Sequence, residues 1–466
     1  MIKLFIRDIG IYGLSGIFVR MVTFLLIPFY VRTLTTDNLG VIDFILVISS
    51  ISGVILSLEI YQFIARFFSE FDESEKNNYA STGLFFYFFT YLGFATIVFI
   101  FATPISQYMF NARGYEFILK LAVIAIFINS IFNYFQNLLR YTLKSVHYSI
   151  SNILFTLSTV CFTIYFVLIQ KLGLEGVYFG QIIGGSIGLI LSAYYNKKYI
   201  SISFYPNALR IMLKFSLPLV SSGLALYAIT FIDRIFIKQF LSLSELGIYG
   251  VAYRISSIPL IFIGFVTSSF VPLMYTKYKN TEIKAELEKI YRFTFFIGFV
   301  IITVISIFSL ELFAIITTPE YESAYKVAPF LLFSGFLMQF ATMFLGLSLT
   351  GKTKIIAYIY IIGFVVSVIS NIVLIPVFGI MGAGIASSIV AVIIFTLQFY
   401  FSQKAYNIHF NYKPYIFSFL ISITFSSFVV VFCTQILPIT LLFKTISLLL
   451  YLLIILFLFK IFALEK

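Results

Sequence analysis

Six charged residues lie inside long apolar stretches of this 466-residue sequence, where few other side chains are charged. They are Arg20, Asp43, Glu59, Asp233, Arg234 and Arg254. A charge in hydrocarbon costs at least about 2.5 kcal/mol, so each one needs a partner or a water-filled cavity. Because guanidinium stays charged and donates to two phosphate or carboxylate oxygens at once, the arginines predict an anionic ligand. The carboxylates predict ion coupling or charge pairing, and pairing that only holds the helices together is the alternative.

Five polar residues between positions 129 and 140 share one face of a predicted helix. They are Asn129, Asn133, Gln136, Asn137 and Arg140, which follow the helical spacing i, i+4, i+7, i+8 and i+11. Gln339 belongs to a weaker polar stripe on a later helix. Such a face avoids lipid and suits either sugar hydroxyls or hydrogen bonds between helices. The sequence leaves these two interpretations open.

The elements that carry these residues are transmembrane helices. The sequence is 61% hydrophobic and 11% charged, with a mean hydropathy of +1.05, whereas a soluble domain carries about 25% charged residues. Runs without alternation, such as Leu448 to Phe459, exclude a β-barrel. The sequence therefore predicts an all-α polytopic membrane protein of about fourteen helices. The predicted spans are 9–31, 40–64, 80–103, 121–139, 147–169, 177–196, 212–238, 246–275, 293–313, 327–349, 355–376, 382–402, 414–436 and 446–463.

Positive charge is distributed unevenly between the two sides of this arrangement. Lysines and arginines at alternate loops and span edges number twenty-one on the side of both termini and seven on the other. The positive-inside rule therefore places both termini in the cytoplasm. The net charge of +12 is explained by topology, because no basic run typical of nucleic-acid binding occurs, and we expect no nucleic-acid partner.

The two halves of the sequence resemble each other. Leu34 to Ile42 aligns with Leu241 to Tyr249, 207 positions later, and Leu168 to Gly176 aligns with Leu374 to Gly382, 206 positions later. These matches predict two parallel six-helix repeats, which is a transporter architecture. We expect an N-lobe over 1–200, a C-lobe over 201–408 and two appended helices over 409–466. The six charged residues fall on the first two helices of each repeat.

No motif of an enzyme or a metal centre occurs. The sequence lacks HExxH, GxSxG, a P-loop and a paired cysteine motif, and Cys161 and Cys433 lie in apolar runs. We therefore predict that the protein is not an enzyme and has no cofactor. Without ATP hydrolysis, transport would use a proton or sodium gradient, the membrane potential or the gradient of its own cargo.

Glycines and prolines predict how the helices pack and bend. Gly180, Gly184 and Gly188 form a small-xxx-small series, which predicts a closely packed helix pair. Prolines fall in or beside spans 1, 7 and 8, where they bend helices and suit gating, although ordinary transmembrane proline explains any single one equally well. They are Pro28, Pro218, Pro259 and Pro272.

Three segments resemble a known family. Leu213 to Leu224, Ile232 to Ile237 and Glu245 to Ile255 are similar to the helix 7 to 8 signature of the bacterial polysaccharide (O-antigen, Wzx-type) flippases. These flippases belong to the multidrug/oligosaccharidyl-lipid/polysaccharide (MOP) exporter superfamily. Arg20 with the following Pro28 to Arg32 also fits the family, so the resemblance covers essentially the whole chain.

The resemblance implies MATE-like lobes and a flippase of the bacterial cytoplasmic (inner) membrane. Its cargo would be undecaprenyl-pyrophosphate-linked oligosaccharide, moved from the cytoplasmic to the periplasmic leaflet by alternating access for O-antigen, capsule or other surface polysaccharide. Membrane lipids and polysaccharide polymerase or assembly proteins would be its partners.

The same resemblance suggests a role for each candidate residue. Arg20, Arg234 and Arg254 would attract the diphosphate, and the stripe from Asn129 to Arg140, with Gln339, would line the path of the sugars. Asp43, Asp233 and Glu59 would pair with the arginines or couple an ion.

Three other functions remain as alternatives. A lipid II flippase would share the mechanism and differ in the sugar. A drug/cation antiporter of the same superfamily should present carboxylates without arginines, and the mixture of charges counts against it. A membrane glycosyltransferase or polymerase would need a large polar loop or a carboxylate cluster outside the bilayer, and the sequence has neither.

Overall fold

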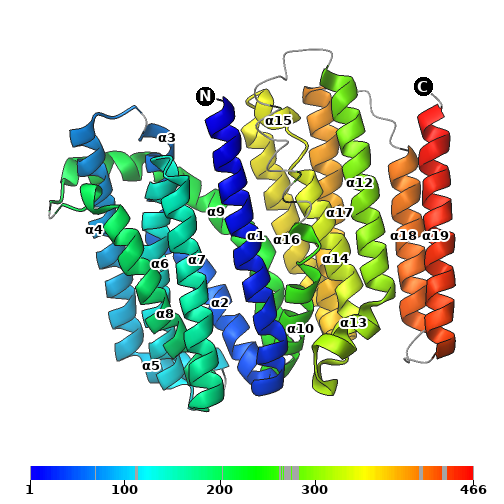
Figure 1. Cartoon of the computed structure of the whole chain (residues 1–466), viewed down its shortest axis with the longest axis horizontal. Helices are drawn as coiled ribbons and strands as arrows, with labels where there is room; N and C mark the ends of the chain where they lie inside the picture. The colour runs from blue at the N-terminus through cyan, green and yellow to red at the C-terminus, as the bar shows by residue number, and fades with distance from the viewer. Residues whose placement is uncertain are drawn as a thin grey trace. The chain divides into compact units, whose positions relative to one another are not determined.

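The computed structural model describes residues 2–68, 70–110, 114–201, 203–261, 264, 266, 274, 283–408, 413–432 and 438–464. Over these ranges the chain forms helices joined by short connections, and no β-strand occurs in them (Figure 1). The predicted all-α class is therefore confirmed. The side chains of residues 2–9 lie outside this description, as do His409 and Cys433.

The chain divides into two compact units, Met1–Phe231 and Ile232–Lys466. The boundary lies inside a long helix, α9 (Pro206–Phe240), which bears Pro218. At about 1.5 Å per residue its 35 residues extend about 52 Å, more than the roughly 30 Å thickness of a bilayer core. The predicted division into 1–200, 201–408 and 409–466 stays a prediction.

The described residues of the first unit form eight α-helices before α9, together with one short π-helical and one short 3-10 segment. They are α1 (Ile2–Thr33), α2 (Thr36–Ser57), α3 (Ile60–Phe67), α4 (Glu73–Ile100), α5 (Ala102–Phe110), α6 (Glu116–Tyr141), α7 (Ser145–Ile164), the π-helical η1 (Tyr165–Ile169), α8 (Gly173–Tyr195) and the 3-10 turn η2 (Lys197–Tyr199).

The described elements of the second unit follow the end of α9. They are α10 (Leu243–Ser256), α12 (Ile283–Ile307), α13 (Ser309–Ile316), η3 (Pro319–Tyr321), α14 (Ala324–Ala341), α15 (Gly346–Leu349), α16 (Thr353–Phe378), α17 (Ile380–Ala405), α18 (Lys413–Phe432) and α19 (Pro438–Leu464).

Within the described residues, 12 helical segments are long and apolar enough to cross a membrane. They agree in position with twelve of the fourteen predicted spans, so a multi-pass membrane protein is confirmed and the count of fourteen is not. Of the other two, 246–275 lies largely outside the described residues, and 414–436 overlaps α18. One predicted span is wrong in form: 40–64 breaks at Leu58 and Glu59, between α2 and α3.

The predicted glycine series closes the interface of α7 and α8. A Cβ atom built on Gly180 would lie 2.2 Å from the Thr163 hydroxyl, and one on Gly188 would lie 2.5 Å from Cβ of Phe155. On Gly184 it would lie 2.4 Å from Cα of Thr159, a backbone atom. Only glycine permits so close an approach, and the predicted packing is therefore confirmed.

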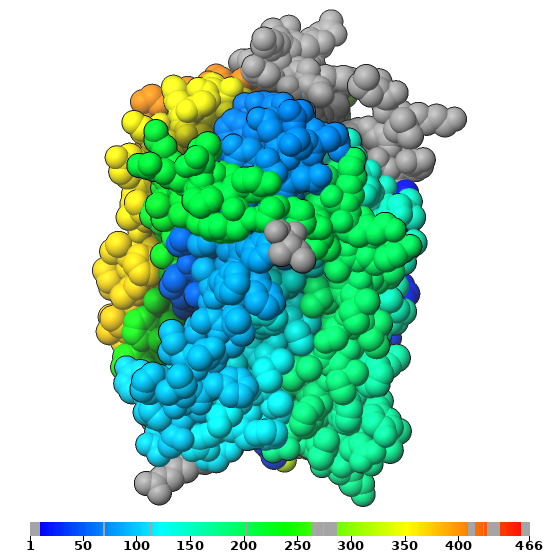
Figure 2. All heavy atoms as spheres, turned by 90° about the vertical axis from the view of Figure 1, so that its left-hand side faces the viewer, coloured from blue at the N-terminus to red at the C-terminus, as the bar shows by residue number. Residues whose placement is uncertain are grey.

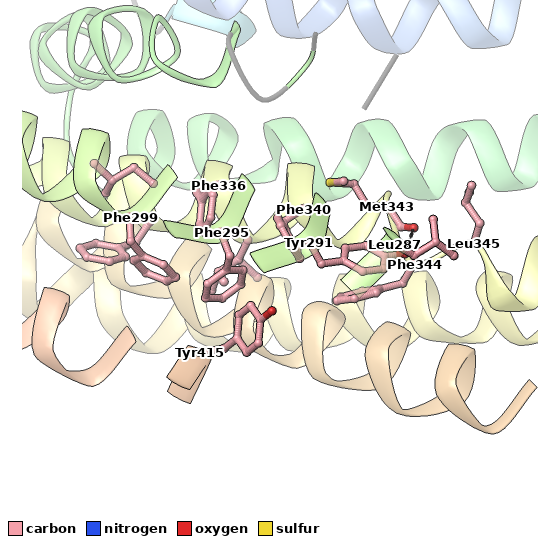
Figure 3. Close-up of a cluster of buried hydrophobic side chains, with 14 of the residues drawn as sticks. Leu287, Tyr291, Phe295, Phe299, Phe336, Phe340, Met343, Phe344, Leu345 and Tyr415 are labelled. Carbon is pink, nitrogen blue, oxygen red and sulfur yellow. Dashed lines mark hydrogen bonds between the residues drawn. The ribbon is translucent and has the colours of Figure 1, made fainter. Parts of the chain in front are cut away.

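The core of the second unit is aromatic. Phenylalanines from α12 and α14 interlock around Phe295, whose ring centroid lies 4.6 Å from that of Phe299 and 4.8 Å from that of Phe340 (Figure 3). Tyr415 of α18 packs on Phe295 at 4.7 Å. The buried hydroxyl of Tyr291 donates a hydrogen bond of 2.8 Å to the carbonyl of Met343, as a polar group in an apolar core requires.

Candidate functional site

Arg20 lies on an open face of α1. Its side chain is exposed, and within the part of the chain that the structure describes no hydrogen bond or ion pair involves it. The opposite side of α1 packs on α7, where the Ser149 hydroxyl donates to the Ser15 hydroxyl at 3.0 Å. Gly13 and Gly16 lie on the same side as Arg20, and a Cβ on either would meet no atom within 4 Å. The guanidinium and the nearby helix backbone are therefore accessible.

Glu59 lies where the predicted second span breaks. Leu58 and Glu59 have left-handed backbone conformations, with φ of 45° and 55°, which cost about 1 to 3 kcal/mol for residues other than glycine. The carboxylate is buried, with 5% of the residue exposed, and accepts a hydrogen bond from Gln62 Nε2 at 3.3 Å. In the described ranges no lysine, arginine or histidine forms an ion pair with it.

The first part of α9 packs against this broken segment. The ring of Phe215 lies 5.3 Å from that of Phe67 on α3, and Figure 2 shows this part of α9 directly beside α3. Further along α9, a Cβ on Gly223 would lie 3.0 Å from Oε1 of Glu59. The sequence analysis singled out Glu59; Gly223 entered it only within the family-signature segment Leu213 to Leu224, with no role of its own.

Asp43 lies on α2 and is buried, with 2% of the residue exposed. It belongs to the same unit as Arg20 and Glu59. Burial of a carboxylate in a membrane helix agrees with the predicted role in pairing or ion coupling, and that role stays a prediction.

The polar stripe on α6 divides into two groups. Asn129 and Asn133 are exposed and joined by a hydrogen bond of 3.2 Å from Asn133 Nδ2 to Asn129 Oδ1. Asn137 is half-buried. Gln136 instead is buried against α7 and donates to the Ser151 hydroxyl at 2.7 Å.

Arg140, at the end of the same stripe, stays exposed. Its Nη2 donates to the Tyr148 hydroxyl at 3.1 Å. The stripe therefore agrees with both interpretations, because Gln136 bonds between helices while Asn129 and Asn133 face outward.

Asp233 and Arg234 form a buried ion pair in the second unit. Arg234 Nη1 lies 3.2 Å from Asp233 Oδ1, and 1% of Arg234 is exposed. The Tyr249 hydroxyl donates a short hydrogen bond to the same carboxylate. The guanidinium carbon lies 4.3 Å from the ring centroid of Tyr253. The predicted charges thus meet each other, and the two α10 tyrosines that complete the cluster were missed.

Arg254 and Gln339 occupy different helices of the second unit, α10 and α14, and both are half-buried. The positive charge of Arg254 influences Tyr321, which lies between α13 and α14. Burial and the charge of Glu320 raise the pKa of Tyr321 to about 12, against the opposing influence of Arg254. The predicted cargo roles of Arg254 and Gln339 stay predictions.

The structure adds one ion pair between helices that sequence reasoning missed. Lys444 of α19 is 1% exposed at its side chain, and its Nζ lies 2.7 Å and 2.9 Å from the two carboxylate oxygens of Glu311 on α13. The signal was available, because Glu311 lies inside the predicted span 293–313. This pair holds α19 to the rest of its unit.

The fold matches solved transporters of low sequence identity. It superposes on the lipid II flippase MurJ in an inward closed conformation with a TM-score of 0.72, 16% identity, and coverage of 97% of this chain and 99% of that one. It superposes on an inward-facing multidrug resistance MATE family transporter of the MOP superfamily with a TM-score of 0.66, 16% identity, and coverage of 83% and 95%. The chain therefore has the fold of MOP superfamily transporters.

The chain belongs to the polysaccharide biosynthesis protein family, whose model matches residues 5–278. The uncharacterized membrane protein MJ1375 of Methanocaldococcus jannaschii is 23% identical over 379 residues, which cover 78% of this chain and 89% of that protein. The resemblance noted in the sequence is thus confirmed at the level of family and fold.

Proposed function

We propose that this protein is a flippase that moves undecaprenyl-pyrophosphate-linked oligosaccharide from the cytoplasmic to the periplasmic leaflet by alternating access. The polysaccharide biosynthesis family and the fold shared with a lipid II flippase support a lipid-linked glycan as cargo. The observation that carries the proposal is the exposed guanidinium of Arg20 in the middle of a membrane helix, which pairs with no residue in the described ranges.

Arg20 has the chemistry to bind the diphosphate. An arginine facing lipid would cost at least about 2.5 kcal/mol, so its exposed position favours a transient anionic partner. Its fork of N–H donors matches two phosphate oxygens. The open backbone at Gly13 and Gly16 leaves room for a bulky diphosphate beside it. Arg254 is the second candidate contact.

The asparagines of α6 are the proposed sugar contacts. Each carboxamide offers two donors and an acceptor, which suits hydroxyl groups that both donate and accept. Asn129, Asn133 and Asn137 repeat every fourth residue along the helix, so their amides form a row along it. Gln136 and Arg140 already bond within the unit and would support this row.

Glu59 is the proposed ion-coupling residue. A buried carboxylate without a cationic side chain beside it is stable in a membrane protein when it is protonated or holds a small cation. The protonated form would couple transport to protons, and the cation-bound form would couple it to sodium. Asp233, by contrast, already neutralises Arg234, and this pair would stabilise the packing of α9 on α10 rather than bind cargo.

The test is deletion of the gene in its host, with analysis of surface polysaccharide and lipid-linked intermediates. We expect loss of the polymer and undecaprenyl-linked oligosaccharide trapped in the cytoplasmic leaflet. Complementation with the wild-type gene and with Arg32→Ala, a change at another exposed arginine of α1, should restore the polymer. Arg20→Ala at equal membrane abundance should not. An intact polymer in the deletion strain would refute the proposal.

Two other functions share the fold. A lipid II flippase is supported by the match over 97% of this chain, and a drug/cation antiporter by the match to a MATE transporter. Trapped peptidoglycan precursor in the deletion strain would indicate the first, and an intact polymer with altered sensitivity to cationic drugs the second. Polymerase or assembly partners would appear as proteins that co-purify with the flippase from wild-type cells.

A further inference from the structure

A group of cations and tyrosines lies where three membrane helices of the first unit have a terminus. α6 ends at Tyr141, α7 begins at Ser145 and α8 ends at Tyr195, and the turn η2 follows. The Asn196 side chain ties η2 to α6 by donating to the carbonyl of Phe135 at 3.2 Å. We call this group the tyrosine-cation patch; it contains Arg140, Lys144, Lys197, Lys198, Tyr148, Tyr194, Tyr195 and Tyr199.

Each cation of the patch lies near a tyrosine ring. The distances from the charged group to the ring centroid are 5.3 Å for Arg140 and Tyr148, and 4.8 Å for Lys197 and Tyr194. Both Lys144 and Lys198 lie 5.8 Å from the ring of Tyr199. These contacts hold the cations in place, and because a tyrosine ring carries no net charge they leave the positive charge uncompensated.

Only one carboxylate of the described chain pairs with these four cations. Glu73 forms an ion pair with Lys198, and this hydrogen bond raises the pKa of the Lys198 ammonium. Arg140, Lys144 and Lys197 have no ion pair within the described residues. Lys144 donates one hydrogen bond to the carbonyl of Tyr195, at 3.3 Å. Three positive charges are therefore available to an outside partner.

The position of the patch identifies the kind of partner. Tyrosines and basic residues at the ends of several membrane helices mark the boundary between hydrocarbon and water, where lipid headgroups lie. Tyr194 is 61% exposed beside Lys197, so the patch faces outward from the helices.

We propose that the tyrosine-cation patch binds the headgroup of an anionic phospholipid of the surrounding leaflet. Arg140, Lys144 and Lys197 contact the phosphate and the additional negative charge of the headgroup. Each basic residue near an anionic membrane surface favours binding by about fivefold. Arg140 also supports the proposed row of sugar contacts on α6, so the test below changes only Lys144 and Lys197, which have no proposed cargo role.

The test uses the absence of tryptophan from this chain. In the full-length Tyr194→Trp variant the new indole is the only one, and brominated lipid next to it quenches its fluorescence. The protein is reconstituted with brominated phosphatidylglycerol diluted by phosphatidylcholine, and separately with the bromine on phosphatidylcholine. The two titrations give the relative affinity of the patch for the anionic lipid.

We expect phosphatidylglycerol to be preferred by at least fivefold at low ionic strength. The preference should fall by at least about fivefold when Lys144→Gln and Lys197→Gln are added, with Arg140 accounting for what remains. It should survive the charge-preserving changes Lys144→Arg and Lys197→Arg. The control is Tyr108→Trp, because Tyr108 is 86% exposed on α5, at the opposite end of the first unit (Figure 1). No preference is expected there.

Three outcomes would overturn the proposal. One is equal quenching by the two lipids at position 194. Another is a preference that does not fall when both lysines are replaced by glutamine. The third is an equal preference at positions 194 and 108, which would assign the attraction to the net charge of +12 rather than to the patch.

Discussion

Replacing Gly184 by alanine should separate α7 from α8. The added Cβ would lie 2.4 Å from both Cα and N of Thr159 and 2.5 Å from the carbonyl carbon of Ser158. Carbon atoms pack at about 3.5 to 4.0 Å, so the methyl group is at least about 1 Å too close. All three neighbours are backbone atoms, and no side-chain rotation relieves the clash. The helices must move apart, which also stretches the 2.7 Å hydrogen bond from the Ser158 hydroxyl to the carbonyl of Gly184.

The expected cost is about 2 to 4 kcal/mol. Overpacking costs about 1 to 3 kcal/mol, and weakening of a hydrogen bond adds about 1 kcal/mol. The matched control is Gly93→Ala on α4, where a Cβ would meet no atom within 4 Å. Alanine is a better helix former than glycine by about 1 kcal/mol, so this change should leave the protein as stable or slightly more stable.

Thermal unfolding of the purified protein in detergent is the assay, followed by size-exclusion chromatography after heating. Gly184→Ala should lose its monodisperse peak at a temperature several degrees below wild type, and Gly93→Ala should not. If Gly184→Ala is as stable as Gly93→Ala, the close approach of α7 and α8 is wrong.

Glu59 and Glu311 carry the remaining predictions. Gly223→Ala places a methyl group 3.0 Å from Oε1 of Glu59. It should reduce the rate of lipid flipping in proteoliposomes by more than twofold while the protein stays folded. An unchanged rate would argue against a role of Glu59 in transport. Lys444→Met leaves the carboxylate of Glu311, whose side chain is 13% exposed, without its partner and should destabilise the second unit by about 3 to 5 kcal/mol. Adding Glu311→Met should recover most of this loss in detergent unfolding, whereas equal stability of the single variant and wild type would contradict the buried pair.

The sequence predicted the fold class well, because composition and run length alone define membrane helices. It also predicted the glycine series of α8, since small residues at every fourth position form one stripe along which a second helix can approach closely. It did not predict the break at Leu58 and Glu59, where no glycine or proline interrupts the helix pattern. The break lies where α9 approaches Glu59 at Gly223, and a local sequence pattern does not contain such a tertiary contact.

The sequence identified individual residues of the candidate site, but not which of them contact each other. Asp233 and Arg234 could have faced cargo or each other, and only the structure shows that they pair. Gln136 was grouped with the asparagines of α6, and at about 100° per residue it lies only about 20° around the helix from the exposed Asn129. Its burial comes from its place about two turns further along α6, where it meets Ser151 of α7, and the sequence pattern does not contain that contact.

Arg20 is the residue that we propose binds the diphosphate of a lipid-linked glycan. The most direct measurement is flipping of undecaprenyl-pyrophosphate-linked oligosaccharide in proteoliposomes by wild type, Arg20→Ala and Arg32→Ala at equal reconstituted amounts. A hydrogen bond to a charged group contributes about 1.5 to 3 kcal/mol, so Arg20→Ala should slow flipping at least about tenfold while Arg32→Ala stays within about twofold of wild type. Normal flipping by correctly inserted Arg20→Ala would contradict this role of Arg20.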